Sequence, residues 1–165
     1  MKVKAIVYTS NTGYTAEYAK LLGEKTGLPV FSLKECTLEK ESEIIYLGWL
    51  RAGSIVDYKK ASKLYDIKIL VGSCLGTTGS MDSSVRKSHK LPDDMPVFTL
   101  WGGFDINKLH GIYKLMMKIV GKAIKNKILE NPTQTEEDRK IIDMLDNGGS
   151  AVDEKYLVPI LMLLK

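Results

Sequence analysis

The sequence predicts an α/β fold: a five-stranded parallel sheet, doubly wound in the order 2-1-3-4-5, with helices on both faces to give three layers. Three observations predict it. Short apolar runs alternate along the chain with segments of helical spacing. A turn rich in hydroxyl groups joins the first apolar run to the first helical segment. The chain has 165 residues, 44% of them hydrophobic, which is enough for the core of a single domain over residues 1–165.

Five segments are predicted as strands, because each is short, largely apolar and rich in β-branched residues, as is typical of strands buried on both faces. They are Val3–Tyr8, Val30–Leu33, Glu43–Gly48, Lys68–Gly72 and Val97–Trp101. Helices are expected between them. The first carries Ala16, Ala19 and Leu22 at helical spacing and ends at Gly27, and the others are predicted around Leu38–Ser42, Asp57–Tyr65 and Ser83–Lys90.

The turn after the first strand concentrates hydrogen-bond donors. It consists of Thr9, Ser10, Asn11, Thr12, Gly13, Tyr14 and Thr15. A strand-to-helix turn directs backbone N–H groups and the positive end of the helix dipole at one spot, where a phosphate binds well. The alternative is a helix cap that binds nothing. A cap needs one hydroxyl, however, and this turn holds four.

The spacing of these residues narrows the kind of phosphate site. The sequence lacks the lysine-containing loop of nucleoside triphosphatases and the glycine pattern of dinucleotide-binding folds. What remains, Ser10-x-Thr12-Gly13-x-Thr15, resembles the first loop of the flavodoxin family. The resemblance implies that this loop wraps the phosphate of FMN with hydroxyls and amides. The loop lies after the first strand, at the topological switch point where such sheets bind their ligands.

Two further loops are implied to complete a flavin site. The first, after the third strand, contains Trp49, Leu50, Arg51, Ala52 and Gly53. In the family resembled, this loop packs on one face of the isoalloxazine, and its glycine lets a peptide turn toward the ring. Arg51 is expected near the ring edge, where positive charge raises the reduction potential. Trp49 is either a stacking partner of the ring or a core or rim residue.

The second loop follows the fourth strand and contains Ser73, Cys74, Leu75, Gly76, Thr77 and Gly79. It lacks the aromatic residue that the family resembled places on the outer face of the flavin. Either that face is open to a substrate, or the loop is a plain Gly/Ser connection. No catalytic residue is assigned from the sequence.

A basic amphipathic segment over about residues 104–129 departs from a small flavodoxin, with a helix expected from Asn107 to Leu129. On a helical wheel, Lys114, Lys118, Lys122 and Lys125 share one sector, and apolar side chains fill most of the remainder. The apolar arc is too wide for one buried face. The helix is therefore expected to meet a partner or an anionic membrane, unless its lysines are only a solvated face.

The same segment carries a second resemblance. Gly102-Gly103-Phe104-Asp105, followed by Lys114–Ile119, is similar to the flavodoxin-type protoporphyrinogen oxidases, which are quinone-linked FMN proteins with a basic insertion at this point. Farther along, Thr133–Glu136 has a capping-box pattern that opens a helix through Leu145. A last helix is predicted over Val152–Leu164, with Pro159 kinking it or lying near its start.

Composition limits the partners. The net charge of +4 differs from the strong acidity typical of flavodoxins, and the basic residues lack the aromatic interleaving of nucleic-acid-binding surfaces. No metal is expected, because His89 and His110 have no ligand neighbours at suitable spacing. Cys36 and Cys74 fit a reducing cytoplasm, and neither a signal peptide nor a membrane-spanning run is predicted.

These observations give three functional hypotheses. The first is an FMN-binding, flavodoxin-like redox protein that transfers electrons with a redox partner protein. The second is an FMN-dependent oxidoreductase of the quinone-linked protoporphyrinogen oxidase type, acting on a small, flat, apolar substrate. The third is a cofactor-free binding module of the same fold. The protein is expected in the cytoplasm, with peripheral contact at the inner membrane face through the lysine-rich helix.

Overall fold

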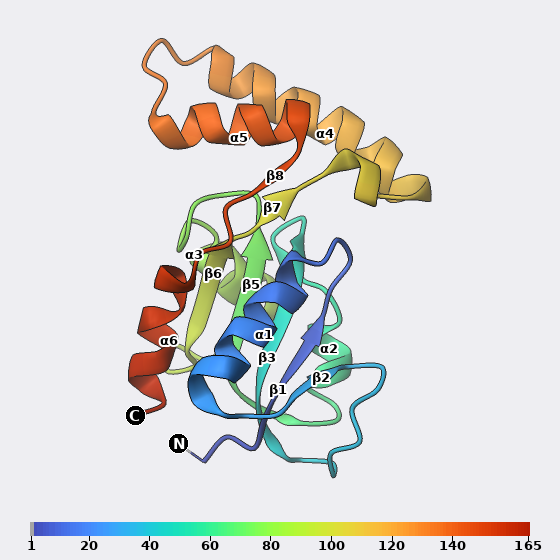
Figure 1. Ribbon diagram of the computed structural model, residues 1–165, viewed down its shortest axis with the longest axis vertical. Helices are drawn as coiled ribbons and strands as arrows, with labels where there is room; N and C mark the ends of the chain where they lie inside the picture. Colours follow the sequence, from blue (N-terminus) through green and yellow to red (C-terminus); the bar gives the residue numbers. More distant parts are fainter. Residues whose placement is uncertain (1) are drawn as a thin grey trace.

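A parallel sheet forms the centre of the molecule (Figure 1). The structure is a computed structural model, and it describes residues 2–165. The strands run in the order β2-β1-β3-β5-β6, which is the predicted order 2-1-3-4-5 once the short hairpin strand β4 is set aside. The fold class is therefore confirmed, and the topology is flavodoxin-like. The strands are β1 (Ala5–Thr9), β2 (Val30–Ser32), β3 (Glu43–Arg51), β4 (Ser54–Ile55), β5 (Asp66–Cys74) and β6 (Val97–Trp101).

Helices cover both faces of this sheet. On one side, α1 (Tyr14–Thr26) and α6 (Val158–Leu163) pack on a core that includes Ile6, Ile45 and Leu100. On the other, α2 (Tyr58–Ala61) and α3 (Asp82–His89) pack on a core that includes Val7 and Tyr46. Adjacent strand residues face opposite sides, because side chains alternate along a strand. Burial on both sides explains why the strand segments are almost uniformly apolar.

Between β6 and α6 the chain forms an insertion beyond the carboxyl edge of the sheet (Figure 1). It consists of β7 (Gly103–Phe104), η1 (Ile106–Lys108), α4 (Gly111–Leu129), α5 (Glu136–Asn147) and β8 (Gly149–Ser150). The short strands β7 and β8 pair with each other as a neck, and α4 and α5 form a helical hairpin above it. A third core, which includes Trp101, Phe104, Leu109 and Met144, holds the neck to the hairpin.

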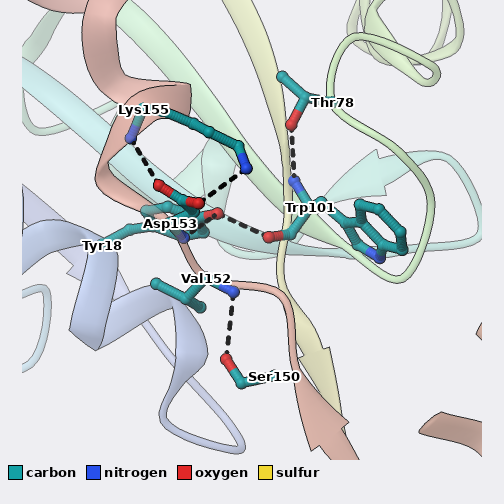
Figure 2. Close-up of polar contacts among 7 residues, drawn as sticks. All are labelled: Tyr18, Thr78, Trp101, Ser150, Val152, Asp153 and Lys155. Carbon is teal, nitrogen blue, oxygen red and sulfur yellow. Dashed lines mark hydrogen bonds and ion pairs between the residues drawn. The ribbon is translucent and has the colours of Figure 1, made fainter. Parts of the chain in front are cut away.

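One tyrosine fastens both ends of the insertion (Figure 2). The Tyr18 hydroxyl on α1 donates to the Trp101 carbonyl at 2.6 Å, and it accepts a longer bond from the Asp153 N–H at 3.4 Å. Nearby, the Ala151 N–H donates to the Gly102 carbonyl at 2.8 Å. The chain therefore leaves and rejoins the sheet at a single point, next to α1.

Several predicted boundaries are corrected. The helix expected around Leu38–Ser42 is wrong: these residues form an irregular turn. Glu41 has φ 62°, and its N–H bonds to the Leu64 carbonyl, so the backbone cannot continue as a helix. The helix expected over Asp57–Tyr65 is the single turn α2, because Asp57 has φ 60° and β5 begins at Asp66.

The C-terminal half also differs in detail. The helix predicted from Asn107 begins only at Gly111, after η1. The capping box that opens α5 pairs Thr135 with Asp138, two residues beyond the predicted pattern. The last helix is split: a 3-10 turn, η2 (Glu154–Leu157), precedes α6, and Pro159 lies in the first turn of α6, as predicted.

Candidate functional site

A small cavity lies at the switch point, where β1 and β3 end side by side and α1 begins. Its volume is about 120 Å³. Nine of the predicted site residues line it: Asn11, Thr12, Tyr14, Thr15, Trp49, Leu50, Ser73, Cys74 and Leu75. The remaining predicted residues lie outside the lining: Thr9, Ser10, Gly13, Arg51, Ala52, Gly53, Gly76, Thr77 and Gly79. The wall carries no acidic side chain.

The turn before α1 leaves donors free at the edge of this cavity. Gly13, with φ 98°, gives its N–H to the Ser10 hydroxyl at 3.2 Å. The first helical bond runs from the Glu17 N–H to the Gly13 carbonyl, so the N–H groups of Tyr14, Thr15 and Ala16 have no acceptor within the helix. The Thr15 side chain is buried. This is an arrangement of amides and hydroxyls that suits an anion.

Thr9 has a different position from the rest of the turn. Its hydroxyl accepts a bond from the Tyr46 hydroxyl at 2.9 Å and donates to the Asp57 carboxylate at 3.3 Å. The Tyr46 hydroxyl also lies 2.9 Å from the Val56 carbonyl. Burial raises the pKa of Tyr46 well above its usual value. Thr9 therefore links β1 to the segment that follows β4.

The segment after the third strand is a β-hairpin rather than the expected loop. Trp49, Leu50 and Arg51 extend β3, and Ala52 and Gly53 turn back into β4 with φ 49° and 76°. Both residues are left-handed, as a tight hairpin turn requires. The turn leads away from the cavity, which is why Ala52 and Gly53 do not line it.

An aromatic contact joins this hairpin to the insertion. The Trp49 ring meets the Tyr113 ring of α4 edge to face, with centroids 5.8 Å apart. The Arg51 guanidinium donates to the Tyr113 hydroxyl at 3.0 Å and lies 6.0 Å from its ring centroid. Trp49 thus both lines the cavity and packs against α4. Arg51 is directed at Tyr113.

The loop predicted after the fourth strand has two parts with different surroundings. Ser73, Cys74 and Leu75 line the cavity, whereas the residues beyond them are fastened to β6. The Thr78 hydroxyl accepts from the Trp101 N–H at 3.2 Å (Figure 2), and the Gly79 N–H donates to the Thr99 carbonyl at 2.8 Å. These bonds draw Gly76, Thr77 and Gly79 toward β6.

Cys74 is a protonated thiol in this setting. Burial raises its pKa to about 11, and its sulfur donates to the Gly76 carbonyl at 3.4 Å. The thiolate is the nucleophilic form, so Cys74 is poorly reactive at neutral pH. It serves as a small apolar part of the cavity wall.

The insertion supplies the lining residues that were not predicted: Gly103, Phe104, Leu109 and Met117. Gly103 must be glycine, because a Cβ there would lie 2.4 Å from the Tyr14 ring. Lys108 lies 4.8 Å from the centroid of the same ring, so Tyr14 anchors the insertion to α1. Gly102-Gly103-Phe104 was used in the sequence-based prediction only as part of a family resemblance, and these residues were not predicted to reach the cavity. The side of the cavity that lacks the expected aromatic residue is therefore covered by the insertion.

The donor chemistry of this site fits a phosphate, and the cavity volume restricts the rest of a ligand. Pockets for small molecules typically occupy about 300–1,000 Å³, well above the 120 Å³ present. Leu109 and Met117 are the wall residues that come from η1–α4. A flavin ring would need a larger cavity than the structure shows.

Neither a metal site nor a membrane-spanning helix is found within residues 2–165. No group of three or more His, Cys, Asp and Glu side chains in that range could hold a metal ion. None of the helices described there, α4 included, combines the length and apolar character needed to cross a bilayer.

Comparison of the chain with models of protein families, with curated proteins and with solved structures finds no match in any of the three. The topology itself is flavodoxin-like, with the strand order β2-β1-β3-β5-β6 and interleaved helices. The assignment of a function therefore depends on the chemistry of the switch-point cavity.

Proposed function

We propose that the protein binds FMN non-covalently at the switch-point cavity and acts as a flavodoxin-like redox protein. The observation that carries the proposal is the turn before α1. It presents three N–H groups without helical acceptors and the hydroxyls of Thr12 and Thr15 beside an apolar cavity, at the position where doubly wound sheets bind ligands. No cationic side chain is needed, because amides and the helix dipole stabilise a phosphate.

Each part of the site has a role under this proposal. Thr12, Thr15 and the first amides of α1 hold the phosphate, and Trp49, Leu50 and Leu75 pack against the ring. When bound, FMN supplies the redox chemistry, and the protein tunes it through nearby charge and solvent access. Arg51 lies on the β3–β4 hairpin, two residues after Trp49. Its positive charge favours a reduced, anionic ligand.

Specific observations favour the two alternatives. Phe104, Leu109 and Met117 make an apolar wall on the side where a flat substrate would approach, which suits an oxidoreductase of the protoporphyrinogen oxidase type. The volume of about 120 Å³ suits a cofactor-free module that binds a smaller ligand. A titration with FMN distinguishes the cofactor-free module from an FMN-binding protein. An oxidation assay with protoporphyrinogen and a quinone distinguishes an enzyme from an electron carrier.

The decisive experiment compares FMN with riboflavin, which lacks the phosphate. The protein should bind FMN much more tightly, because the charge-assisted bonds at the turn are worth roughly 1.5–3 kcal/mol each. Thr12→Ala with Thr15→Ala should lower FMN affinity by a few kcal/mol at most and leave riboflavin affinity unchanged. Isothermal titration calorimetry or quenching of flavin fluorescence measures both constants.

Two controls keep this test interpretable. Thr37→Ala with Thr133→Ala removes two exposed hydroxyls that belong neither to the turn nor to the cavity lining, and it should change neither constant. Thr15→Ser keeps the buried hydroxyl, so it should retain affinity if the hydroxyl rather than the methyl group matters. Equal affinity for FMN and riboflavin, or for neither, would reject the proposal in favour of the cofactor-free module.

A further inference from the structure

Helix α4 has two apolar faces, and only one of them is covered. Its inner face carries Tyr113 and Met117, which join the third core, and the buried Gly121, which lies against Leu145 of α5. The outer face carries Ile112, Leu115 and Ile119, whose side chains are 71%, 62% and 67% exposed. Met116 and Val120, on the same face, are 40% and 41% exposed. Solvent-exposed apolar rows of this size on a soluble helix mark an interaction surface.

The charged side chains of helix α4 are all cationic. Helix α4 contains five lysines and no acidic residue. Lys118, Lys122 and Lys127 are exposed, Lys114 is partly buried, and Lys125 is paired with Asp146 of α5 at 2.7 Å. Lys127, which was not in the predicted stripe, replaces Lys125 as an available cation. Glu130, which is exposed, caps the C-terminus of α4, and the other acidic residues of the hairpin lie on α5.

The exposed apolar side chains and the lysines of α4 together indicate which kind of partner fits this face. Two copies that met through this face would bring their lysine rows together, with no acidic side chain on α4 to offset them. An anionic lipid surface satisfies both features at once: apolar side chains enter the boundary between headgroups and acyl chains, and lysine stems extend the ammonium groups to the phosphates. The hairpin stands on its neck beyond the sheet (Figure 1), so the helix projects from the body of the domain.

We propose that the outer face of α4, formed by Ile112, Leu115, Met116, Ile119 and Val120 with Lys118, Lys122 and Lys127, binds peripherally to an anionic lipid bilayer. The helix lies in the interface and does not cross the membrane. This inference does not depend on FMN, because the face is separate from the switch-point cavity. Its failure and that of the proposed function are therefore distinguishable.

The test is sedimentation of the purified, full-length protein with vesicles. The protein should bind equimolar phosphatidylcholine and phosphatidylglycerol at low ionic strength, bind much less at high salt, and ignore phosphatidylcholine alone. Lys118→Gln, Lys122→Gln and Lys127→Gln together should weaken binding on the order of 100-fold, at about 5-fold per lysine. Lys60→Gln, Lys63→Gln and Lys87→Gln remove the same charge from exposed sites on the sheet domain and should have little effect.

A second variant tests the apolar contribution. Leu115→Gln with Ile119→Gln keeps every charge and should abolish sedimentation, while circular dichroism and FMN affinity stay as in the unmodified protein. Absence of binding to either vesicle overturns the proposal, as does equal loss in the two lysine variants. A dimer of the unmodified protein in sedimentation equilibrium, lost in Leu115→Gln/Ile119→Gln, would also overturn it by assigning the face to a second copy.

Discussion

At the scale of single residues, the Tyr18 hydroxyl and the His89 imidazole join elements in a way that the sequence does not reveal. Tyr18 is fully buried on α1, and its hydroxyl bonds to both ends of the insertion. His89 closes α3 against the β3–β4 hairpin: the Ile55 N–H donates to its Nε2 at 2.9 Å, and the Tyr58 ring lies 4.4 Å away. His89 is therefore a partly buried link between two elements.

Removal of the Tyr18 hydroxyl should destabilise the fold. Tyr18→Phe keeps the ring in the core but leaves the Trp101 carbonyl without this donor, which should lower the free energy of unfolding by about 1–3 kcal/mol. Urea denaturation followed by circular dichroism measures the change. Tyr58→Phe removes a hydroxyl that makes no hydrogen bond within residues 2–165, so it should cost much less. Equal effects of the two substitutions would show that the Tyr18 bonds add no stability.

Stability should fall in mild acid because of His89. Burial, with a smaller contribution from the positive charge of Lys59, lowers the pKa of His89 below its usual value. The folded protein therefore favours neutral imidazole, whereas the unfolded chain takes up a proton first as the pH falls. The free energy of unfolding should be constant above about pH 7 and decline below about pH 6.5, toward the lower pKa of the folded state.

The matched variant for this pH dependence is His89→Gln. It does not titrate, so its stability should change less between pH 7.5 and pH 5.5, a range above the usual pKa of carboxylates of about 4. Urea denaturation at a series of pH values measures both slopes. Parallel slopes for the two proteins would assign the acid sensitivity to other groups.

At the scale of elements, the β3–β4 hairpin gives the clearest departure from the sequence-based prediction. Trp49–Arg51 continues a buried strand, and only Ala52 and Gly53 make the turn. The sequence carries no Asn-Gly or Asp-Gly signal there, and alanine rarely adopts φ 49°. The family resemblance assigned this segment to a flavin loop, and for that reason the continuation of β3 to Arg51 was not predicted.

The turn holds strain that substitution can relieve. Ala52→Gly and Ala52→Asn should each stabilise the protein, by up to about 1 kcal/mol, because both residues tolerate left-handed backbone better than alanine. Gly53→Ala should have the opposite effect, since Gly53 has φ 76°. Thermal denaturation measures all three. A loss of stability in both Ala52 variants would show that the turn is not strained.

At the scale of the whole molecule, the sheet could be predicted from the sequence. The part of the cavity wall that the insertion supplies could not. Five apolar runs separated by helical segments indicate a parallel sheet covered on both faces, and general rules of connection leave few strand orders for it. The contact of Arg51 with Tyr113 joins residues 62 positions apart, and no local pattern encodes it. For the same reason the sequence did not show that Leu109 and Met117 line the cavity.

Helix α4 therefore belongs to two surfaces at once, since Met117 faces the cavity and Ile119 faces outward. A ligand that displaced Met117 would also act on α4, and a surface that held α4 in place would oppose that displacement. Binding at the two faces would then be a linked equilibrium. Whatever factor a ligand in the cavity applies to affinity at the outer face, a partner at the outer face must apply to the ligand.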